Sequence, residues 1–506
     1  MVILKTPKRI AFVLISSQKL LKGTSFYALG QIVVIGGGFL LLPIYAYYLA
    51  PDEFGIIGIV MATSNILGTI LILGLPSAQY RFYAELRRKK EDLGNFLFSI
   101  NSSVLALNSI VFGLLLFTPL GLIFFNLLVS QDKMSYMPYM GLIILLIFLG
   151  IAKLLATSFF VADQRITLVV VVDLLQFVIN AALSLYFIIF LEMGAVGQIL
   201  GTVLALFLGP LPLYLLYFKR INPKLELGLV FQSFKIGFPL AITSLFGALL
   251  STANILIIQK IVSLNDAGLY SIALSLGSVI GIVTVSFNNA WMTPFNDLML
   301  SYELGSDEVR TNAALRKSFS SFLLMICTFC LILETFSKEG VFLLLKPKYH
   351  ELTKFLPIMF VGFLGSGLTL YWVNFYIFYK RTHWIPFFRF IGLLLNILLN
   401  LLITPHFGLL GAAYIFAVTN IIIFLLTYIG CTKLFYNPKI NHIKTFIPLM
   451  FIANPIYFIV LGSNGFLFLL LRFLYLIFYF AIIFLIYRNL ILGIVNNLFH
   501  SYFQSS

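Results

Sequence analysis

Residues 50–55 read Ala-Pro-Asp-Glu-Phe-Gly, and residues 263–268 read Ser-Leu-Asn-Asp-Ala-Gly. A second pair of short turns is Met-Gly-Ala-Val-Gly at 193–197 and Phe-Gly-Leu-Leu-Gly at 407–411. Gly55 and Gly268 are 213 residues apart, and Gly194 and Gly408 are 214 apart. The two pairs of turns are separated by nearly the same number of residues, which indicates an internal duplication. The chain is therefore predicted to contain two similar lobes.

Apolar runs of about 20 residues, the length of a membrane-spanning helix, lie between these turns. The first six are expected near 24–49, 54–79, 96–117, 138–160, 166–190 and 196–218. The next six are expected near 236–262, 269–291, 318–337, 355–379, 384–403 and 409–430, and two more near 445–462 and 466–487. The sequence is 61% hydrophobic, which exceeds the share in soluble domains. We therefore predict an all-α polytopic membrane protein with about 14 transmembrane helices: two six-helix lobes related by pseudo-twofold symmetry, plus two C-terminal helices.

The predicted domains follow from these runs. Residues 1–23 form a cytosolic amphipathic N-terminal segment, 24–218 the N-lobe and 219–235 a cytosolic linker. Residues 236–430 form the C-lobe, and 431–506 contain the two accessory helices and a cytosolic tail.

The Lys and Arg residues outside the spans are distributed unequally. One side of the predicted topology carries 24 of them and the other side 5. Because positive loops stay in the cytosol, both termini are expected there. This asymmetry accounts for the net charge of +15, so no nucleic-acid partner is expected.

The sequence shows few signs of covalent chemistry. Cys327 and Cys330 form a CxxC inside an apolar span and are expected to be ordinary buried thiols. With 5 His and no phosphate-binding loop motif, the chain shows no zinc or nucleotide signature, so no metal site is expected.

Ionisable residues inside spans are costly and are therefore candidates for function. Lys153 is expected near mid-membrane, either as a cavity cation or bonded to a neighbouring helix. Asp173, Gln176 and Asn180 form a polar stripe at helical spacing. Asp173 is expected to pair with Lys153, to take up a proton or to bond sugar hydroxyls, and helix–helix bonding is the alternative.

Further polar candidates lie in later spans. Arg389, Asn396 and Asn400 share roughly one helix face and either line a cavity or, for Arg389, extend to the cytosol. Lys260 and Arg472 are expected to extend to the outer surface, although Lys260 stays a cavity candidate. Glu334 is expected to be solvated near the outer end of its span.

Candidates for bending and gating lie near the N-terminus. The triplet Gly36-Gly37-Gly38 with Pro43 favours a hinge in the first helix, and close helix packing is the alternative. Arg81 and the basic run after it are expected to touch anionic head groups, with gating as the other possibility. Pro239 is expected at the start of its span.

Several ordered motifs carry a resemblance to a known family. They are Leu49-Ala50-Pro51-Asp52-Glu53-Phe54-Gly55, Gly74-Leu75-Pro76, Arg81-Phe82-Tyr83, Asp266-Ala267-Gly268-Leu269-Tyr270, Ala290-Trp291-Met292-Thr293-Pro294-Phe295, Lys346-Pro347-Lys348-Tyr349, Asn396-x-x-x-Asn400-Leu401-Leu402-Ile403-Thr404-Pro405 and Gly408-x-x-Gly411-Ala412-Ala413. In this set the chain resembles the polysaccharide-transporter branch of the multidrug/oligosaccharidyl-lipid/polysaccharide exporter superfamily, which includes O-antigen flippases.

That resemblance implies a flippase of the bacterial plasma membrane that works by alternating access. Its cargo would be a polyprenyl-diphosphate-linked oligosaccharide, for O-antigen (lipopolysaccharide), capsule or exopolysaccharide synthesis. Implied partners are this lipid-linked oligosaccharide, membrane lipids and a polysaccharide polymerase or other assembly protein. No cofactor is expected; a coupling ion, H⁺ or Na⁺, is implied, but the sequence shows no site for it.

Two other functions stay open. A drug or small-molecule exporter of the same superfamily would share the fold. A membrane polysaccharide polymerase would need acidic or Arg-rich sites on sizeable outer loops, and the longest outer loops, near 118–137 and 338–354, carry no paired carboxylates. The chain is therefore expected not to be an enzyme.

Overall fold

The computed structural model describes residues 30, 33–34, 36–89, 93–129, 134–305, 308–436, 442–452 and 466–504. Within these ranges the regular elements are all helical and no strand occurs. The chain divides into two compact units, residues 1–271 and 272–506, which are described separately. The predicted all-α membrane fold is confirmed.

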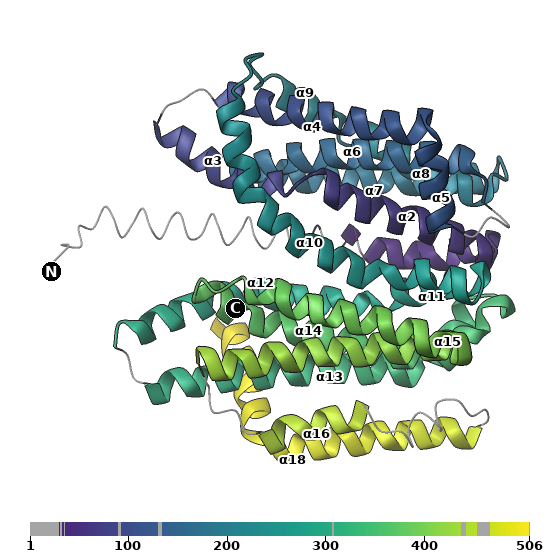
Figure 1. The fold of residues 1–506 in the computed structure, drawn as a ribbon. Helices are drawn as coiled ribbons and strands as arrows, with labels where there is room; N and C mark the ends of the chain where they lie inside the picture. Colours follow the sequence, from purple (N-terminus) through teal and green to yellow (C-terminus); the bar gives the residue numbers. More distant parts are fainter. Residues whose placement is uncertain are drawn as a thin grey trace. The chain divides into compact units, whose positions relative to one another are not determined.

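In the part that the structure describes, the first unit contains the helical residues 36–48, nine further helices and the start of another (Figure 1). They are α2 (Pro51–Leu71), α3 (Leu75–Lys89), α4 (Leu93–Phe117), α5 (Pro119–Leu128), α6 (Tyr136–Ala162), α7 (Ile166–Ile189), α8 (Gly194–Leu208), α9 (Leu211–Phe218), α10 (Leu227–Ile261) and α11 (Leu264–Gly277). Helix α2 packs on α6, α8 and α10, and α7 packs along α8.

The start of α2 follows from its sequence. Pro51 occupies the first turn, where its missing N–H is not needed. Glu53 Oε2 accepts a hydrogen bond from the Ala50 backbone N–H at 2.6 Å, and Asp52 adds a second carboxylate at this end. Both acids suit the positive end of the helix dipole.

The predicted single span 54–79 is wrong, because the helix breaks at residues 72–74. Leu73 and Gly74 have φ values of +53° and +68°, outside the helical region. A Cβ on Gly74 would lie 2.1 Å from the Gly237 carbonyl oxygen of α10. The break therefore lets the backbone of the α2–α3 turn pass directly against α10.

Two other expectations in this unit need correction. The predicted outer loop 118–137 contains α5, which begins at a Pro after the Thr118 cap. Pro239 does not start a span, because α10 begins at Leu227 and Pro239 lies inside it.

A buried polar network joins four helices of this unit. The Gln79 side chain of α3 donates to the Tyr217 hydroxyl of α9 at 3.1 Å and accepts from Ser158 of α6. Asn101 of α4 donates to the same Tyr217 hydroxyl at 2.7 Å. Since each partner is satisfied away from water, the network fixes the register of these helices.

The second unit contains the rest of α11 and the later helices. They are α12 (Val279–Glu303), α13 (Glu308–Leu344), the 3-10 helix η1 (Pro347–Lys354), α14 (Leu356–Phe378), α15 (Trp384–Leu434), α16 (His442–Ile452) and α18 (Phe466–Gln504). Helix α15 is broken at Gly408, whose φ of 57° and ψ of −141° are not helical. This break separates the two spans predicted at 384–403 and 409–430.

The C-terminal helices α16 and α18 pack on α13. One face of α18 is buried in this unit. Its residues recur at the spacing of one helix face and are Arg472, Leu476, Tyr479, Ile483 and Tyr487. Arg472 is only 2% exposed and bonds Glu339 at 2.6 Å, so the expectation that it extends to the surface is wrong.

Eleven helices of the described part are long and apolar enough to cross a membrane, and α15 counts once although it carries two predicted spans. The predicted span 24–49 is described only in part. Most of the predicted span 445–462 and the whole segment 1–23 lie outside the described residues. The domain boundaries stay predictions; α10, expected to open the C-lobe, packs on α2 and α3 in the first unit.

Candidate functional site

An ion pair between α6 and α7 is the clearest charged feature of the first unit. Lys153 Nζ lies 2.8 Å from Asp173 Oδ1, and the two side chains are 22% and 15% exposed. Two opposite charges that are this far buried attract each other more strongly than they would in water, because neither is fully hydrated. Of the alternatives open for Asp173, its pairing with Lys153 is thus present in the structure.

The next turns of α7 carry the other members of the predicted stripe. Asn180 Oδ1 accepts hydrogen bonds from Ser184 at 2.9 Å and from Thr202 of α8 at 3.3 Å, so it ties two helices together. Gln176 packs against Gly209, and its buried Oε1 has no hydrogen-bond partner among the described residues. Its role in binding stays a prediction.

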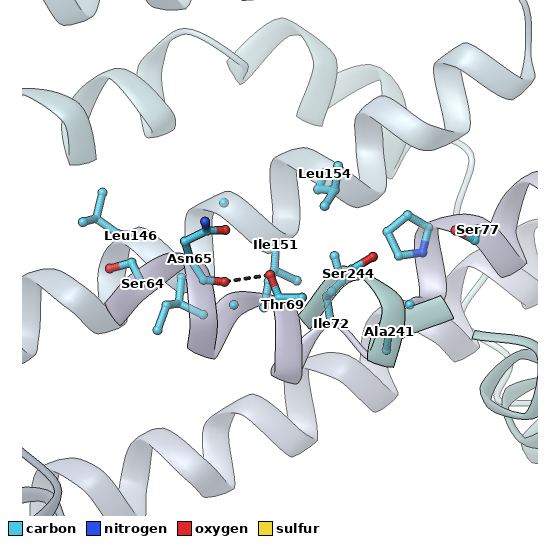
Figure 2. A pocket seen from close by; sticks show the side chains of 15 residues that line it. Ser64, Asn65, Thr69, Ile72, Ser77, Leu146, Ile151, Leu154, Ala241 and Ser244 are labelled. Atoms are coloured by element: carbon cyan, nitrogen blue, oxygen red, sulfur yellow. Dashed lines mark hydrogen bonds between the residues drawn. The ribbon is translucent and has the colours of Figure 1, made fainter. Parts of the chain in front are cut away.

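A cavity of about 310 Å³ opens between α2, α3, α6 and α10 of the first unit. Figure 2 shows hydroxyl and amide side chains from three of these helices along it. Its polar residues are Ser64, Asn65, Thr69, Ser77 and Ser244. No charged residue is among the described residues that line it.

The polar groups of this cavity differ in how they are bonded. The Thr69 hydroxyl donates to the Asn65 backbone carbonyl at 2.7 Å, as the dashed line in Figure 2 marks. Ser64 Oγ is buried and has no hydrogen-bond partner in the part of the chain that the structure describes. A buried hydroxyl without a hydrogen-bond partner is costly, so a small rotation of this side chain that brings the hydroxyl to the cavity would be favourable.

Lys153 does not line the cavity, but its neighbours do. Gly150, Ile151 and Leu154 of α6 form part of the wall. The ion pair therefore lies on the same helix segment as the cavity, on an adjacent face.

The other predicted site residues are spread over both units. Lys260 is exposed and bonds the Leu127 carbonyl at the end of α5. In the second unit, Asn400 donates to the Asn396 carbonyl at 2.8 Å, and Thr404 donates to Asn400 Oδ1 at 2.9 Å. Asn396 and Asn400 are 1% and 0% exposed, so in this structure they bond along α15. Arg389 is half-buried near the start of the same helix.

The hinge and gating candidates are placed as follows. Residues 36–48, including Pro43, are helical. A Cβ on Gly37 would lie 2.3 Å from the Phe177 ring of α7, whereas Gly36 and Gly38 face open space. Gly37 thus provides close helix packing, and hinge bending stays a prediction. Arg81 is exposed on α3.

Sequence reasoning missed the cavity residues and two acids. Glu53 appeared only as a member of the motif at 49–55, although its Oε1 accepts from the Ala195 N–H of α8 at 3.2 Å. Glu334, expected to be solvated, is 0% exposed, so that expectation is wrong. Cys327 and Cys330 are buried free thiols, as predicted. The uncharged Ser, Asn and Thr of α2 gave no signal in the sequence, because such residues are common in packed helices.

Helices of membrane-spanning length with a partly polar cavity between four of them are typical of multi-pass membrane transporters. Residues 20–295 match the family model described as polysaccharide biosynthesis protein. The chain therefore belongs to the polysaccharide biosynthesis protein family. No curated protein matches the sequence significantly.

Solved structures share the fold. A lipid II flippase, MurJ, in an inward closed conformation has a TM-score of 0.64 at 15% identity, covering 94% of this chain and 100% of that chain. An inward-facing multidrug resistance MATE family transporter of the MOP superfamily has a TM-score of 0.59 at 13% identity, covering 79% and 94%. A MOP superfamily transporter from Pyrococcus furiosus has a TM-score of 0.50 at 14% identity, covering 83% and 97%. At these identities the likeness concerns the fold.

Proposed function

We propose that this protein is a flippase that moves a polyprenyl-diphosphate-linked oligosaccharide across the bacterial plasma membrane by alternating access. The translocated repeat unit would serve O-antigen, capsule or exopolysaccharide synthesis. Membership of the polysaccharide biosynthesis family and the transporter fold support this function. In this proposal both termini are cytosolic, in line with the distribution of Lys and Arg.

The cavity of the first unit is the observation that carries the proposal: no charged residue from the described part of the chain lines it, and five polar side chains lie in a wall that is otherwise apolar. Sugar hydroxyls both donate and accept hydrogen bonds, and Asn65 and Ser244, whose side chains are exposed, offer matching groups. At roughly 30 Å³ per water molecule, about 310 Å³ holds about ten waters, or a sugar-sized group in their place. A drug exporter that selects lipophilic cations would be better served by a carboxylate or aromatic lining, and neither is among the described lining residues.

The neighbouring ion pair suits the diphosphate of the same substrate. Asp173 neutralises Lys153 while the cavity is empty. An arriving diphosphate competes with Asp173 for the ammonium group, because both are anionic hydrogen-bond acceptors. The proposal thus assigns the sugar to the hydroxyl-lined cavity and the diphosphate to Lys153.

The test is made in a strain that lacks this protein, by mass spectrometry of its polyprenyl-linked oligosaccharides and an assay of which leaflet holds them. The proposal expects complete repeat units trapped on the cytosolic side, and rescue by the wild-type gene. Single units that reach the outer face but are never lengthened would indicate a polymerase. Unchanged glycan intermediates would instead favour the drug-exporter alternative.

A further inference from the structure

A buried acid in the second unit is not used by the proposed substrate site. Glu334 of α13 is 0% exposed. Its Oε1 accepts a long hydrogen bond from the Cys330 thiol at 3.6 Å, and its Oε2 has no hydrogen-bond partner among the described residues. A thiol is a weak donor, so this environment stabilises a carboxylate poorly.

The charged and titratable groups near α13 are engaged elsewhere. On α18, Arg472 pairs with Glu339 at 2.6 Å, and the Tyr479 hydroxyl bonds Thr328 at 3.0 Å. The Tyr475 hydroxyl donates to the Phe451 carbonyl at 2.8 Å, and farther along α18 Tyr487 is buried and Arg488 is exposed. On α14 the hydroxyl of Tyr371 donates to the Leu315 carbonyl and that of Tyr376 to the Thr427 carbonyl.

The remaining groups lie farther along their elements. On η1, His350 lies 3.3 Å from the Leu345 carbonyl, Lys354 pairs with Glu351 at 3.2 Å, and Lys348 lies over the ring of the buried Tyr349. On α12, Asp297, Tyr302 and Glu303 lie near the C-terminal end. The described side chains of α16 include no titratable group. Cys327 lies on α13 two turns before Glu334, and Lys338 lies one turn after it; no ion pair to Glu334 is present among the described residues.

An ionised carboxylate without a cation or strong donors is strongly disfavoured in such a site, whereas the neutral acid is tolerated. We propose that Glu334 is a proton-binding site, occupied while α16 and α18 cover α13 and emptied when this packing loosens and water reaches the carboxyl group. The site gives the transporter a place to couple proton exchange to a conformational change. It does not depend on which substrate the protein carries.

Infrared spectroscopy of the purified full-length protein at neutral pH tests the occupancy. The wild type should show the C=O stretch of a protonated carboxylic acid, which is lost in Glu334→Gln and kept in the control Glu339→Gln. In wild type labelled with ¹³C-glutamate the band should shift, which provides a test without any substitution. A spectrum in which Glu334→Gln removes no such band, or in which the label shifts none, would overturn the proposal.

The native thiols near Glu334 can be used to test whether its proton is linked to the packing of α16 and α18 on α13. In a Cys431→Ser background, maleimide labelling in membranes reports only on Cys327 and Cys330, which are both buried. As pH rises and Glu334 loses its proton, labelling should increase more in the wild type than in Glu334→Gln. Comparing the wild type with Glu334→Gln at each pH cancels the intrinsic rise of thiol reactivity with pH. Identical pH profiles in the two proteins would show that the proton is not linked to this packing.

Discussion

Glu53 of α2 and Ala195 of α8 are joined by a hydrogen bond of 3.2 Å between the Glu53 carboxylate and the Ala195 backbone N–H. The same carboxylate accepts from the Ala50 N–H at 2.6 Å. One side chain thus satisfies the free N–H groups at the start of two helices. The turns at 50–55 and 193–197, which the repeat analysis treated as separate anchors, are therefore one structural junction.

Replacing Glu53 with Ala should destabilise the first unit by about 1–3 kcal/mol, because two backbone N–H groups lose a charged acceptor. Thermal unfolding in detergent, followed by circular dichroism or by aggregation, measures the change; the three Trp residues all lie in the second unit, so their fluorescence does not report on the first. The control Asp52→Asn should cost less, because an asparagine side chain at this position keeps an oxygen that can accept from the Glu53 N–H, the local bond that Asp52 makes at 3.2 Å. Equal losses in the two variants would argue against the junction.

Gly194→Ala should be destabilising by at least about 1–2 kcal/mol, the cost of a left-handed backbone for a residue with a Cβ. Gly194 has a φ of +54°, and an added Cβ would lie 2.0 Å from Glu53 Oε1. The matched control is Gly281→Ala in α12, where a Cβ meets open space. That change should be neutral or stabilise by about 0.5–1 kcal/mol.

The Gly194 and Glu53 effects should not add. Part of the cost of Gly194→Ala is the displacement of the Glu53 carboxylate, so it should be smaller in the Glu53→Ala background. Strict additivity of the two losses in unfolding experiments would contradict the contact.

Lys153→Ala should reduce glycan export by about tenfold or more while leaving membrane insertion intact, since a lost charged hydrogen bond costs about 1.5–3 kcal/mol. The variant Asp173→Asn should lower stability, because it leaves Lys153 without its partner. Export is read from surface glycan, and the amount of folded protein from quantitative blotting of membranes.

The double variant Lys153→Met with Asp173→Leu separates a substrate role from helix bonding. If the pair only joins α6 and α7, the double variant should recover both stability and export. The proposed role predicts recovery of stability without export.

Asn65→Leu and Ser244→Val should each impair export without unfolding the protein, because they replace cavity hydrogen-bonding groups with apolar ones of similar size. The control is Ser301→Val, an exposed position on α12 whose hydroxyl bonds only the local Asp297 carbonyl. Export that is unchanged in both cavity variants would mean that the cavity does not hold the cargo.

The helical membrane fold could be predicted because membrane crossing depends on local hydropathy, which is read directly from consecutive residues. The break at Gly408 was also predictable, since Pro405 and Gly408 interrupt an apolar run. The break after Leu71 was missed because the apolar run continues through Ile72 and Leu73, although Gly74 and Pro76 follow directly. The structure explains the break by the close approach of Gly74 to the backbone of Gly237 in α10. Hydropathy does not record such tertiary contacts.

The candidate site was harder to predict from the sequence than the fold. Lys153 and Asp173 stood out because charge is rare within spans, and they are paired in the structure. Glu334 and Arg472 were misplaced because their positions near span ends suggested contact with water, whereas the packing of α18 on α13 buries both of them inside the second unit. The cavity depends on four helices meeting, so its neutral Ser, Asn and Thr could not be distinguished from packing residues.

The most direct test of the central claim is translocation by the purified protein in proteoliposomes. A polyprenyl-diphosphate oligosaccharide is placed in one leaflet, and its access to a membrane-impermeant glycan-modifying enzyme is followed with time. The account predicts movement that depends on the protein, is strongly reduced by Lys153→Ala and Asn65→Leu, and is unaffected by Ser301→Val. If the wild-type protein, shown to be folded, moves no more glycolipid than empty vesicles do under any imposed ion gradient, the account is contradicted.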